Sequence, residues 1–174
     1  MNIGRVIVGG SAVLALAAGT GFVATVFSPS DLQADAGGMC ADSNYMDDVL
    51  VGMPISNNSK DAIELTSARV ESLEGVTVKG TWINPIDGSG NNVGSVEYSP
   101  EAMDTYALHP VGGTMVPPGE TTNVVFGIAT DDGLGRARDF SVDYIGNYGI
   151  SHTRTATGVF GFSRGNTESE ECTS

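Results

Sequence analysis

The chain has 174 residues, with 21 acidic side chains against 8 Lys and Arg, and a formal net charge of -13 at pH 7. This charge argues against nucleic acid as a partner and against lying flat on anionic lipid, because both would repel it. A hydrophobic content of 40% is too high for a disordered chain.

The first predicted element is a membrane helix at residues 6–27. This run of about 22 residues carries no charge and, at 1.5 Å per residue, is long enough to cross a bilayer core. Arg5 precedes it, whereas residues 28–59 contain five Asp and no Lys or Arg. Because positive residues stay in the cytoplasm, we expect a single-pass protein of the cell membrane, N-terminus cytoplasmic and the remainder extracytoplasmic.

A cleaved secretory signal is the alternative. Residues 34–36 read Ala-Asp-Ala, which fits a cleavage site and would free the chain from Gly37 onward. The apolar run is longer than the 7–15 residues typical of a signal, which favours a retained anchor. Both interpretations export the rest of the chain.

Small residues recur at every fourth position of this helix and predict a packing face. They are Ser11, Ala15 and Gly19, and in a second row Ala17, Gly21 and Thr25. Such spacing lets another helix approach closely, as in docking onto a larger membrane complex or self-association. The alternative is that Gly and Ala are simply common in membrane helices.

Two cysteines, Cys40 and Cys172, bracket the rest of the chain. In an oxidising exterior we expect them to form a disulfide. Copper bound by sulfur is the alternative, because Met39, Met46 and Met53 lie near Cys40; a methionine is more often core filler. We expect no metal and no cofactor.

The predicted organisation has four parts: a membrane anchor at 1–27, a tether at 28–44, a β-sandwich at 45–163 and an acidic tail at 164–174. Within the third part, alternating apolar residues and Gly, Pro and Asn turns predict eight strands, at 45–55, 62–72, 76–83, 93–98, 105–111, 121–129, 138–145 and 150–162. A single helical turn is expected at 100–104, capped by Ser99.

Two of these strands predict which side chains face the core. In the strand at 138–145, Phe140, Val142 and Tyr144 alternate with polar residues and should point inward. In the strand at 76–83, Trp82 is expected in the core beside the gap left by Gly80. A shift of phase near residue 68 indicates a β-bulge in the strand at 62–72.

Short strands without a convincing amphipathic helix predict an all-β fold, an antiparallel immunoglobulin-like β-sandwich of 7–9 strands after one transmembrane helix. A small barrel or jelly roll is the alternative. The cysteines stand at the wrong places for the bridge of antibody domains.

Four segments carry a resemblance to a known group of proteins: residues 49–55 (VLVGMPI), 63–65 (IEL), 117–120 (PPGE) and 140–144 (FSVDY). With the single anchor, they resemble small actinobacterial membrane-anchored proteins with an Ig-like extracytoplasmic domain. The resemblance implies an accessory or scaffolding module, with a respiratory membrane assembly as one candidate setting. It supplies no catalytic residues.

Catalytic motifs are absent from the sequence. Its two histidines are His109 and His152, and Ser151 beside His152 would point to the opposite face of a strand. Adjacent acids such as Asp47 and Asp48 are typical of solvated loops. We therefore predict a non-enzymatic subunit that docks onto a larger membrane protein complex. The alternatives are an extracytoplasmic metal- or ligand-binding domain and a self-assembling surface or filament subunit, so a homo-oligomer stays open.

Overall fold

The computed structural model describes residues 31–85 and 92–164, which belong to a compact unit running from Asp31 to Ser174. The predicted membrane helix at 6–27, its packing face and Cys172 lie outside the described residues. Within them, no helix is long and apolar enough to cross a membrane.

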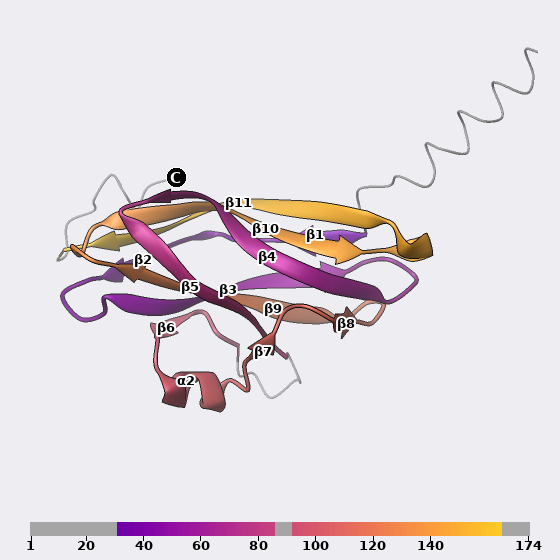
Figure 1. Ribbon diagram of the computed structural model, residues 1–174, viewed down its shortest axis with the longest axis horizontal. Coiled ribbons are helices and arrows are strands. Elements are labelled where there is room, and N and C mark those ends of the chain that lie inside the picture. The colour runs from indigo at the N-terminus through magenta and orange to yellow at the C-terminus, as the bar shows by residue number, and fades with distance from the viewer. Residues whose placement is uncertain (1–30, 86–91, 165–174) are drawn as a thin grey trace, which may run out of the picture. The chain divides into compact units, whose positions relative to one another are not determined.

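The described chain forms two β-sheets packed face to face (Figure 1). The first, sheet A, has the order β1 (Leu32–Ala34), β3 (Asp48–Asn57), β9 (Thr121–Thr130), β5 (Val76–Asn84) and β7 (His109–Pro110), with β6 (Ser95–Glu97) also on β3. The second, sheet B, has the order β2 (Gly38–Asp42), β11 (Ser151–Ser163), β10 (Gly135–Ile145), β4 (Ile63–Glu74) and β8 (Thr114–Val116).

The strand order is that of the immunoglobulin fold. Taking β1, β3, β5 and β9 as strands A, B, D and E gives one sheet with the order A-B-E-D. Taking β4, β10 and β11 as C, F and G gives the opposing sheet, and β2 continues the first strand into it beside G. The predicted all-β two-sheet sandwich is therefore confirmed.

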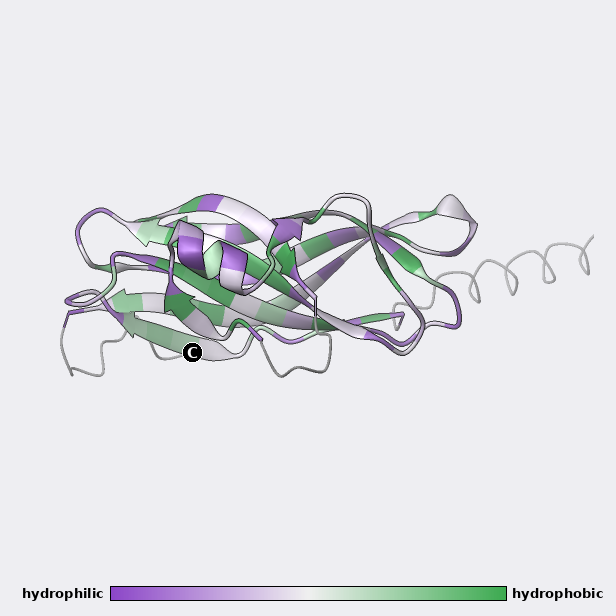
Figure 2. Cartoon of the chain, turned by 90° about the horizontal axis from the view of Figure 1, so that it is seen from below, coloured by the Kyte–Doolittle hydropathy of each residue, from purple (hydrophilic) through white to green (hydrophobic). Residues whose placement is uncertain are grey.

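The core lies between the sheets and is filled by alternate residues of their long strands. In β3 the inward residues are Val49, Val51, Met53 and Ile55; in β9 they are Val124, Phe126 and Ile128; in β10 they are Phe140, Val142 and Tyr144. The rings of Phe126 and Phe140 meet in the core in an edge-to-face arrangement, with their centroids 5.0 Å apart. The inward alternation predicted for β10 is confirmed. Figure 2 shows the apolar stretches along the long strands.

Three expectations about the strands need correction. Residues 28–44 are not simply a tether, because β1 and β2 lie within them and join the two sheets. The described residues contain eleven strands rather than 7–9. The sandwich is not wholly antiparallel either, since β2 runs parallel to β11. These short edge strands carry Gly, Ala and Asp in place of a clear apolar alternation, so the sequence pattern did not reveal them.

Trp82 lies on the outer face of sheet A, not in the central core as predicted. The register of β5 against β9 shifts between Val78 and Gly80, so Lys79 is a bulge residue. Because side chains alternate with a period of two, one extra residue turns those beyond it to the other face. The Trp82 ring does cover Gly80, as expected: a Cβ there would lie 2.5 Å from it.

The bulge predicted near residue 68 is found at Thr66, where the register of β4 against β10 shifts. The helical turn is confirmed as α2 (Pro100–Thr105), and the Ser99 side chain accepts a hydrogen bond from the backbone N–H of Ala102. α2 belongs to the long β5–β9 connection, which covers the outer face of sheet A (Figure 2).

Candidate functional site

A second hydrophobic cluster holds this connection against sheet A. Leu50 of β3, Val125 of β9 and Val93 of the connection are fully buried together. Around them pack the partly buried side chains Trp82, Val96, Tyr98, Ala102, Met103, Tyr106 and Leu108. The outer face of sheet A is apolar at this place, and residues of the chain's own β5–β9 connection cover it.

Two buried asparagines fix the connection at Val93. Asn84 of β5 and Asn123 of β9 are register partners on neighbouring strands. The Val93 N–H donates to Asn84 Oδ1 at 3.2 Å, and Asn123 Nδ2 donates to the Val93 carbonyl at 2.7 Å. Asn84 Nδ2 also donates to the Tyr106 carbonyl at 2.8 Å. Both backbone polar groups of Val93 are thereby satisfied away from water.

Gly52 of β3 allows this close approach. A Cβ at position 52 would lie 1.9 Å from the Val93 carbonyl oxygen and 2.5 Å from Asn123 Nδ2. The Gly52 N–H itself donates to the Gly94 carbonyl at 2.9 Å. Only glycine lets the backbone of the connection lie directly on the strand.

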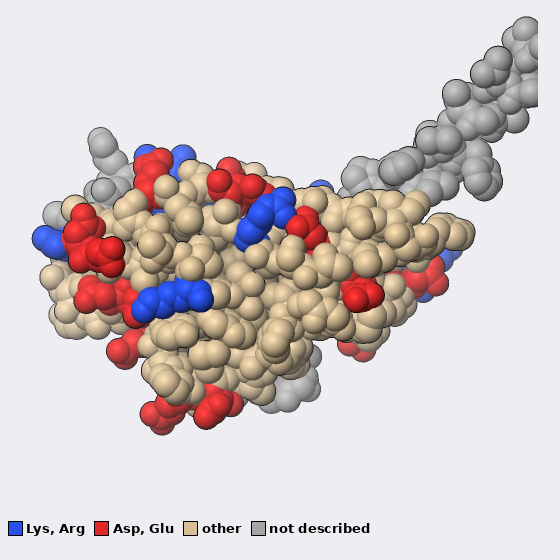
Figure 3. Space-filling view, in the orientation of Figure 1, with Lys and Arg blue, Asp and Glu red and all other residues tan. Residues whose placement is uncertain are grey.

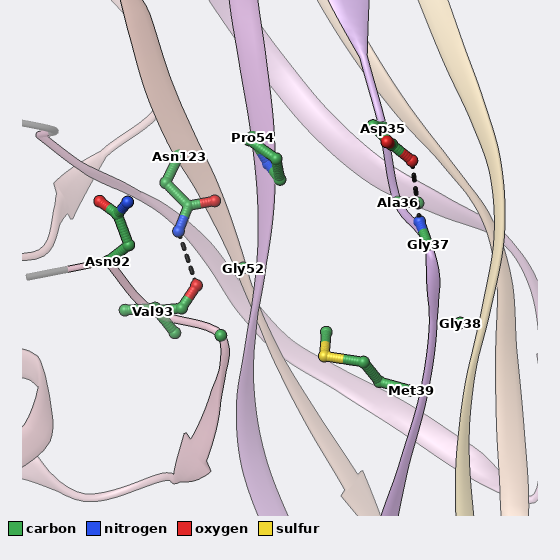
Figure 4. Close-up of a pocket in the computed structure, with 11 residues that line it drawn as sticks. Asp35, Ala36, Gly37, Gly38, Met39, Gly52, Pro54, Asn92, Val93 and Asn123 are labelled. Carbon is green, nitrogen blue, oxygen red and sulfur yellow. Dashed lines mark hydrogen bonds between the residues drawn. The ribbon is translucent and has the colours of Figure 1, made fainter. Parts of the chain in front are cut away.

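A cavity of about 390 Å³ opens beside this contact (Figure 4). It is lined by Asp35, Ala36, Gly37, Gly38, Met39, Gly52, Pro54, Asn92, Val93, Gly94 and Asn123. It lies where the chain passes from β1 in sheet A to β2 in sheet B, between the parts of β3 that β1 and β6 cover. Four of the lining residues are glycines, so few side chains fill the space.

Asn123 Oδ1 is a buried acceptor with no hydrogen-bond partner among the described residues, and Asn123 is only 2% exposed. The Val93 carbonyl fixes the orientation of the amide, because the NH₂ group must face it. Figure 4 shows Oδ1 on the side of Pro54, away from Val93. Asn123 is one of the residues that line the cavity, so an N–H or O–H donor that reached Oδ1, of a water or of a ligand, would meet an acceptor without a partner.

The rim of the cavity adds negative charge. Asp35 Oδ1 accepts a hydrogen bond from the Gly37 N–H at 3.2 Å, and the Asp35 N–H donates to the Pro54 carbonyl at 3.3 Å. No Lys or Arg is among the lining residues. A neutral or cationic hydrogen-bond donor therefore fits this cavity better than an anion does.

The two histidines belong to different sheets. His152 of β11 stacks on Tyr144, with ring centroids 5.2 Å apart. His109 of β7 lines a smaller cavity of about 170 Å³ with Met115 and Glu120. Among residues 31–85 and 92–164, no three His, Cys, Asp or Glu side chains gather as a metal site.

The methionines considered for copper serve the apolar core instead. Met53 is buried at 2% exposure, and Met39 and Met46 pack against the same core. No described cysteine is free. Cys40 lies on β2, opposite Gly161 of β11. Its pairing with Cys172 stays a prediction, because Cys172 lies outside the described residues.

The acidic pairs have structural partners in part. Asp48 forms an ion pair with Lys79, whose ammonium also lies over the Tyr98 ring. Asp132 Oδ1 accepts a hydrogen bond from the Leu134 N–H at 3.2 Å and so shapes the β9–β10 turn.

A polar cluster on the outer face of sheet B was not predicted. The Asp143 carboxylate accepts hydrogen bonds from Thr153 Oγ1 at 2.6 Å, Ser67 Oγ at 2.7 Å and Arg69 Nη1 at 2.6 Å. The Thr153 hydroxyl foremost, then Ser67 and Arg69, lower the pKa of Asp143, and desolvation opposes them. The cluster joins β4, β10 and β11, and only the register between strands reveals it.

Asn84 and Asn123 together hold the backbone of Val93 and are here called the clamp. The clamp was likewise not predicted. A glycine within the apolar run of β3 and an asparagine at the start of the apolar run of β9 were the available signals. Nothing local shows that the two asparagines bind the N–H and the carbonyl of the same residue, Val93.

No protein-family model matches this chain, and no curated protein matches its sequence. Among solved structures, the Vibrio cholerae VesB protease aligns with a TM-score of 0.43 at 14% identity, over 80% of this chain and 34% of the protease chain. The PapD-like domain 7 (ASH / PapD-like) of human CEP192 aligns with a TM-score of 0.39 at 7% identity, over 94% of this chain and 97% of that one. A family 123 glycoside hydrolase from Clostridium perfringens aligns with a TM-score of 0.34 at 8% identity, over 78% of this chain and 28% of that one.

This chain therefore spans about a third of the length of the protease chain. All three TM-scores are below 0.5, so these likenesses carry no argument about activity. The immunoglobulin-like assignment rests on the strand order.

Proposed function

We propose that this protein is a non-enzymatic accessory subunit of a larger membrane protein complex, anchored by its N-terminal helix with the sandwich on the extracytoplasmic side. The observation that supports this is the direct succession of two elements along the chain. The uncharged run ends at residue 27, and β1 of a compact sandwich begins at Leu32. An exported domain held this close to a bilayer is suited to contact other membrane proteins.

Two polar groups of sheet B serve the structure. Ser141 hydrogen-bonds to Thr155 at 2.7 Å, and Asp143 accepts hydrogen bonds from its three donors. The small-residue face of the anchor supplies the proposed contact within the membrane. A respiratory assembly is one such complex.

Copurification of the full chain in mild detergent tests this function. We expect a defined set of membrane proteins to accompany the wild type and to be lost in the double variant Ala15→Leu, Gly19→Leu, which fills the packing face. The matched control is Thr20→Leu, which on an ideal helix lies outside the substituted row, about 140° from Ala15 and about 100° from Gly19. A chain that purifies alone at native expression, or a control variant as defective as the double variant, argues against the proposal.

A ligand-binding role is the second candidate, favoured by the unpartnered Asn123 Oδ1 beside the cavity. Ethanolamine, a small cation with both N–H and O–H donors, is a suitable probe. In nuclear magnetic resonance titrations we expect shifts at the Asn123 side-chain amide and at the Gly52 and Gly94 backbone amides. Acetate is the matched anionic control. Shifts with acetate but not with ethanolamine, or none at millimolar concentration, exclude this role for amines.

A further inference from the structure

One end of the sandwich, here called the proximal end, is the end at which the chain enters β1. Leu32 pairs with Asn57 there, and the Asp31 carbonyl accepts a hydrogen bond from the Asn58 N–H at 2.8 Å. Ile145 at the end of β10 pairs with Glu64 at the start of β4. The start of β1, the β3–β4 turn and the β10–β11 turn therefore lie together.

The β10–β11 turn exposes an aromatic side chain at this end. Tyr148 is 90% exposed in the 3₁₀ turn η1 (Asn147–Gly149), and its φ of 63° lies in the left-handed region that suits glycine or asparagine. Folding of the sandwich does not explain a tyrosine here, because it packs on little of the domain and takes a strained backbone conformation.

The β10–β11 turn itself lacks charge, in a chain whose net charge is -13. Between Asp143 and Arg154 there is no Asp, Glu, Lys or Arg, and the same holds for residues 110–119. The latter segment brings exposed Met115 to the proximal end through β8, which pairs with the start of β4. Elsewhere the proximal end does carry charge: the β3–β4 turn has Lys60 and Asp61, and Asp31, Glu64 and Glu120 stand at the starts of β1, β4 and β9.

The distal end carries charges of both signs. The turns and strand ends there hold Asp42, Asp47, Asp48, Glu74, Asp131 and Asp132; Lys79 pairs with Asp48, Arg136 pairs with Glu74, and Arg164 donates to the Asp132 carbonyl. In Figure 3 acidic and basic side chains both lie at the end opposite the β10–β11 turn, and the tip of that turn is tan. Tyr45, the other strongly exposed tyrosine at 81%, belongs to this distal end through the contact of Ser43 with Gly133.

The length of chain before β1 brings the proximal end close to a bilayer. Residues 28–31 are the only ones between the predicted helix and Leu32, and four extended residues reach about 14 Å at most. Tyr144 lies near Asp31, whose charge adds to burial in raising the Tyr144 pKa. From Tyr144 the β10–β11 hairpin continues for roughly 10 Å. Figure 1 shows the turn of this hairpin beyond the start of β1.

We infer that the β10–β11 turn is a membrane-contact site, with Tyr148 inserted into the lipid headgroup layer of the bilayer that holds the anchor; this rests on the proposed anchoring. The headgroup layer favours a tyrosine, whose ring is apolar and whose hydroxyl remains hydrated. An uncharged turn meets no repulsion from anionic lipid.

Hydroxyl-radical footprinting of the full chain tests this inference. The chain is incorporated at one copy per nanodisc, in a bilayer of phosphatidylethanolamine and phosphatidylglycerol. Tyr148 and Tyr45 are compared within one sample. By exposure in the sandwich alone, Tyr148 should react at least as fast as Tyr45. Membrane contact predicts that Tyr148 reacts several-fold more slowly than Tyr45.

The variant Ser151→Glu places a negative charge beside the turn at an exposed position. It should restore the reactivity of Tyr148 to that of Tyr45, and the circular dichroism spectrum checks that the variant is folded. If the wild type incorporates into nanodiscs but its two tyrosines react equally fast, the inference is overturned and the proposed anchor is not. Failure of the full chain to incorporate overturns the anchor and the inference together.

Discussion

Gly52→Ala should be among the most damaging single-methyl additions in the sandwich. The new Cβ would lie 1.9 Å from the Val93 carbonyl oxygen, which belongs to backbone and cannot rotate away. Ordinary contact begins at about 3.4 Å, so relief requires the connection to move outward by roughly 1.5 Å. That movement stretches the hydrogen bonds of Val93 with Asn84 and Asn123.

The expected cost follows from the groups left unsatisfied. Each buried polar group that loses its partner costs about 1–3 kcal/mol, and overpacking alone costs about as much. We therefore expect the free energy of unfolding to fall by about 3–5 kcal/mol, at the upper end for single substitutions. Gly94→Ala is the matched control, because no heavy atom lies within 4 Å of its Cβ and its φ is not in the left-handed region. It should change stability by less than about 1 kcal/mol.

Urea unfolding of the Asp31–Ser174 unit, followed by circular dichroism, measures both variants. Trp82, the single tryptophan, packs in the same cluster as Val93 and provides a second readout. Its emission should shift to longer wavelength in native Gly52→Ala, because the lifted connection admits water. Stability within about 0.5 kcal/mol of the wild type, with unchanged emission, would refute the close contact.

Three further predictions concern other parts of the sandwich. Asp143 has a lowered folded pKa, so its contribution is present above the unfolded pKa of about 3.9 and is lost as pH falls through the folded value. The wild type should exceed Asp143→Asn in stability at neutral pH by a margin that shrinks in denaturant titrations below about pH 4; a constant margin contradicts this. Cys172→Ser should lower stability by about 4–5 kcal/mol if it pairs with Cys40, and the intact wild-type chain should weigh two hydrogens less than the reduced one. Asn57→Ala leaves the Val116 and Asp61 carbonyls without their donor and should cost about 2–4 kcal/mol by thermal or urea unfolding; a neutral effect contradicts the buried hydrogen bonds.

The sequence predicts the long strands well because their signal is local. In β10, Phe140, Val142 and Tyr144 alternate with polar residues, and all three are buried. The helical turn at α2 follows from Ser99 and Pro100 in the same way, because a cap and a first-turn proline act within one turn.

Features that depend on distant residues were not predictable. The bulge at Lys79 moves Trp82 to the other face, and only pairing with β9 reveals it. Asn84 and Asn123 bind the N–H and the carbonyl of the same residue, Val93, although they stand far apart along the chain. A glycine at position 52 indicates a close approach of another segment to β3, but the sequence pattern does not show which segment that is.

Protease treatment of intact protoplasts that express the full chain with a C-terminal tag tests the central claim most directly. The account predicts that the protein stays with the membrane after alkaline carbonate washing and that external protease removes the tag. A tag protected until the membrane is broken, or a chain released into the wash, would contradict a sandwich anchored on the extracytoplasmic side.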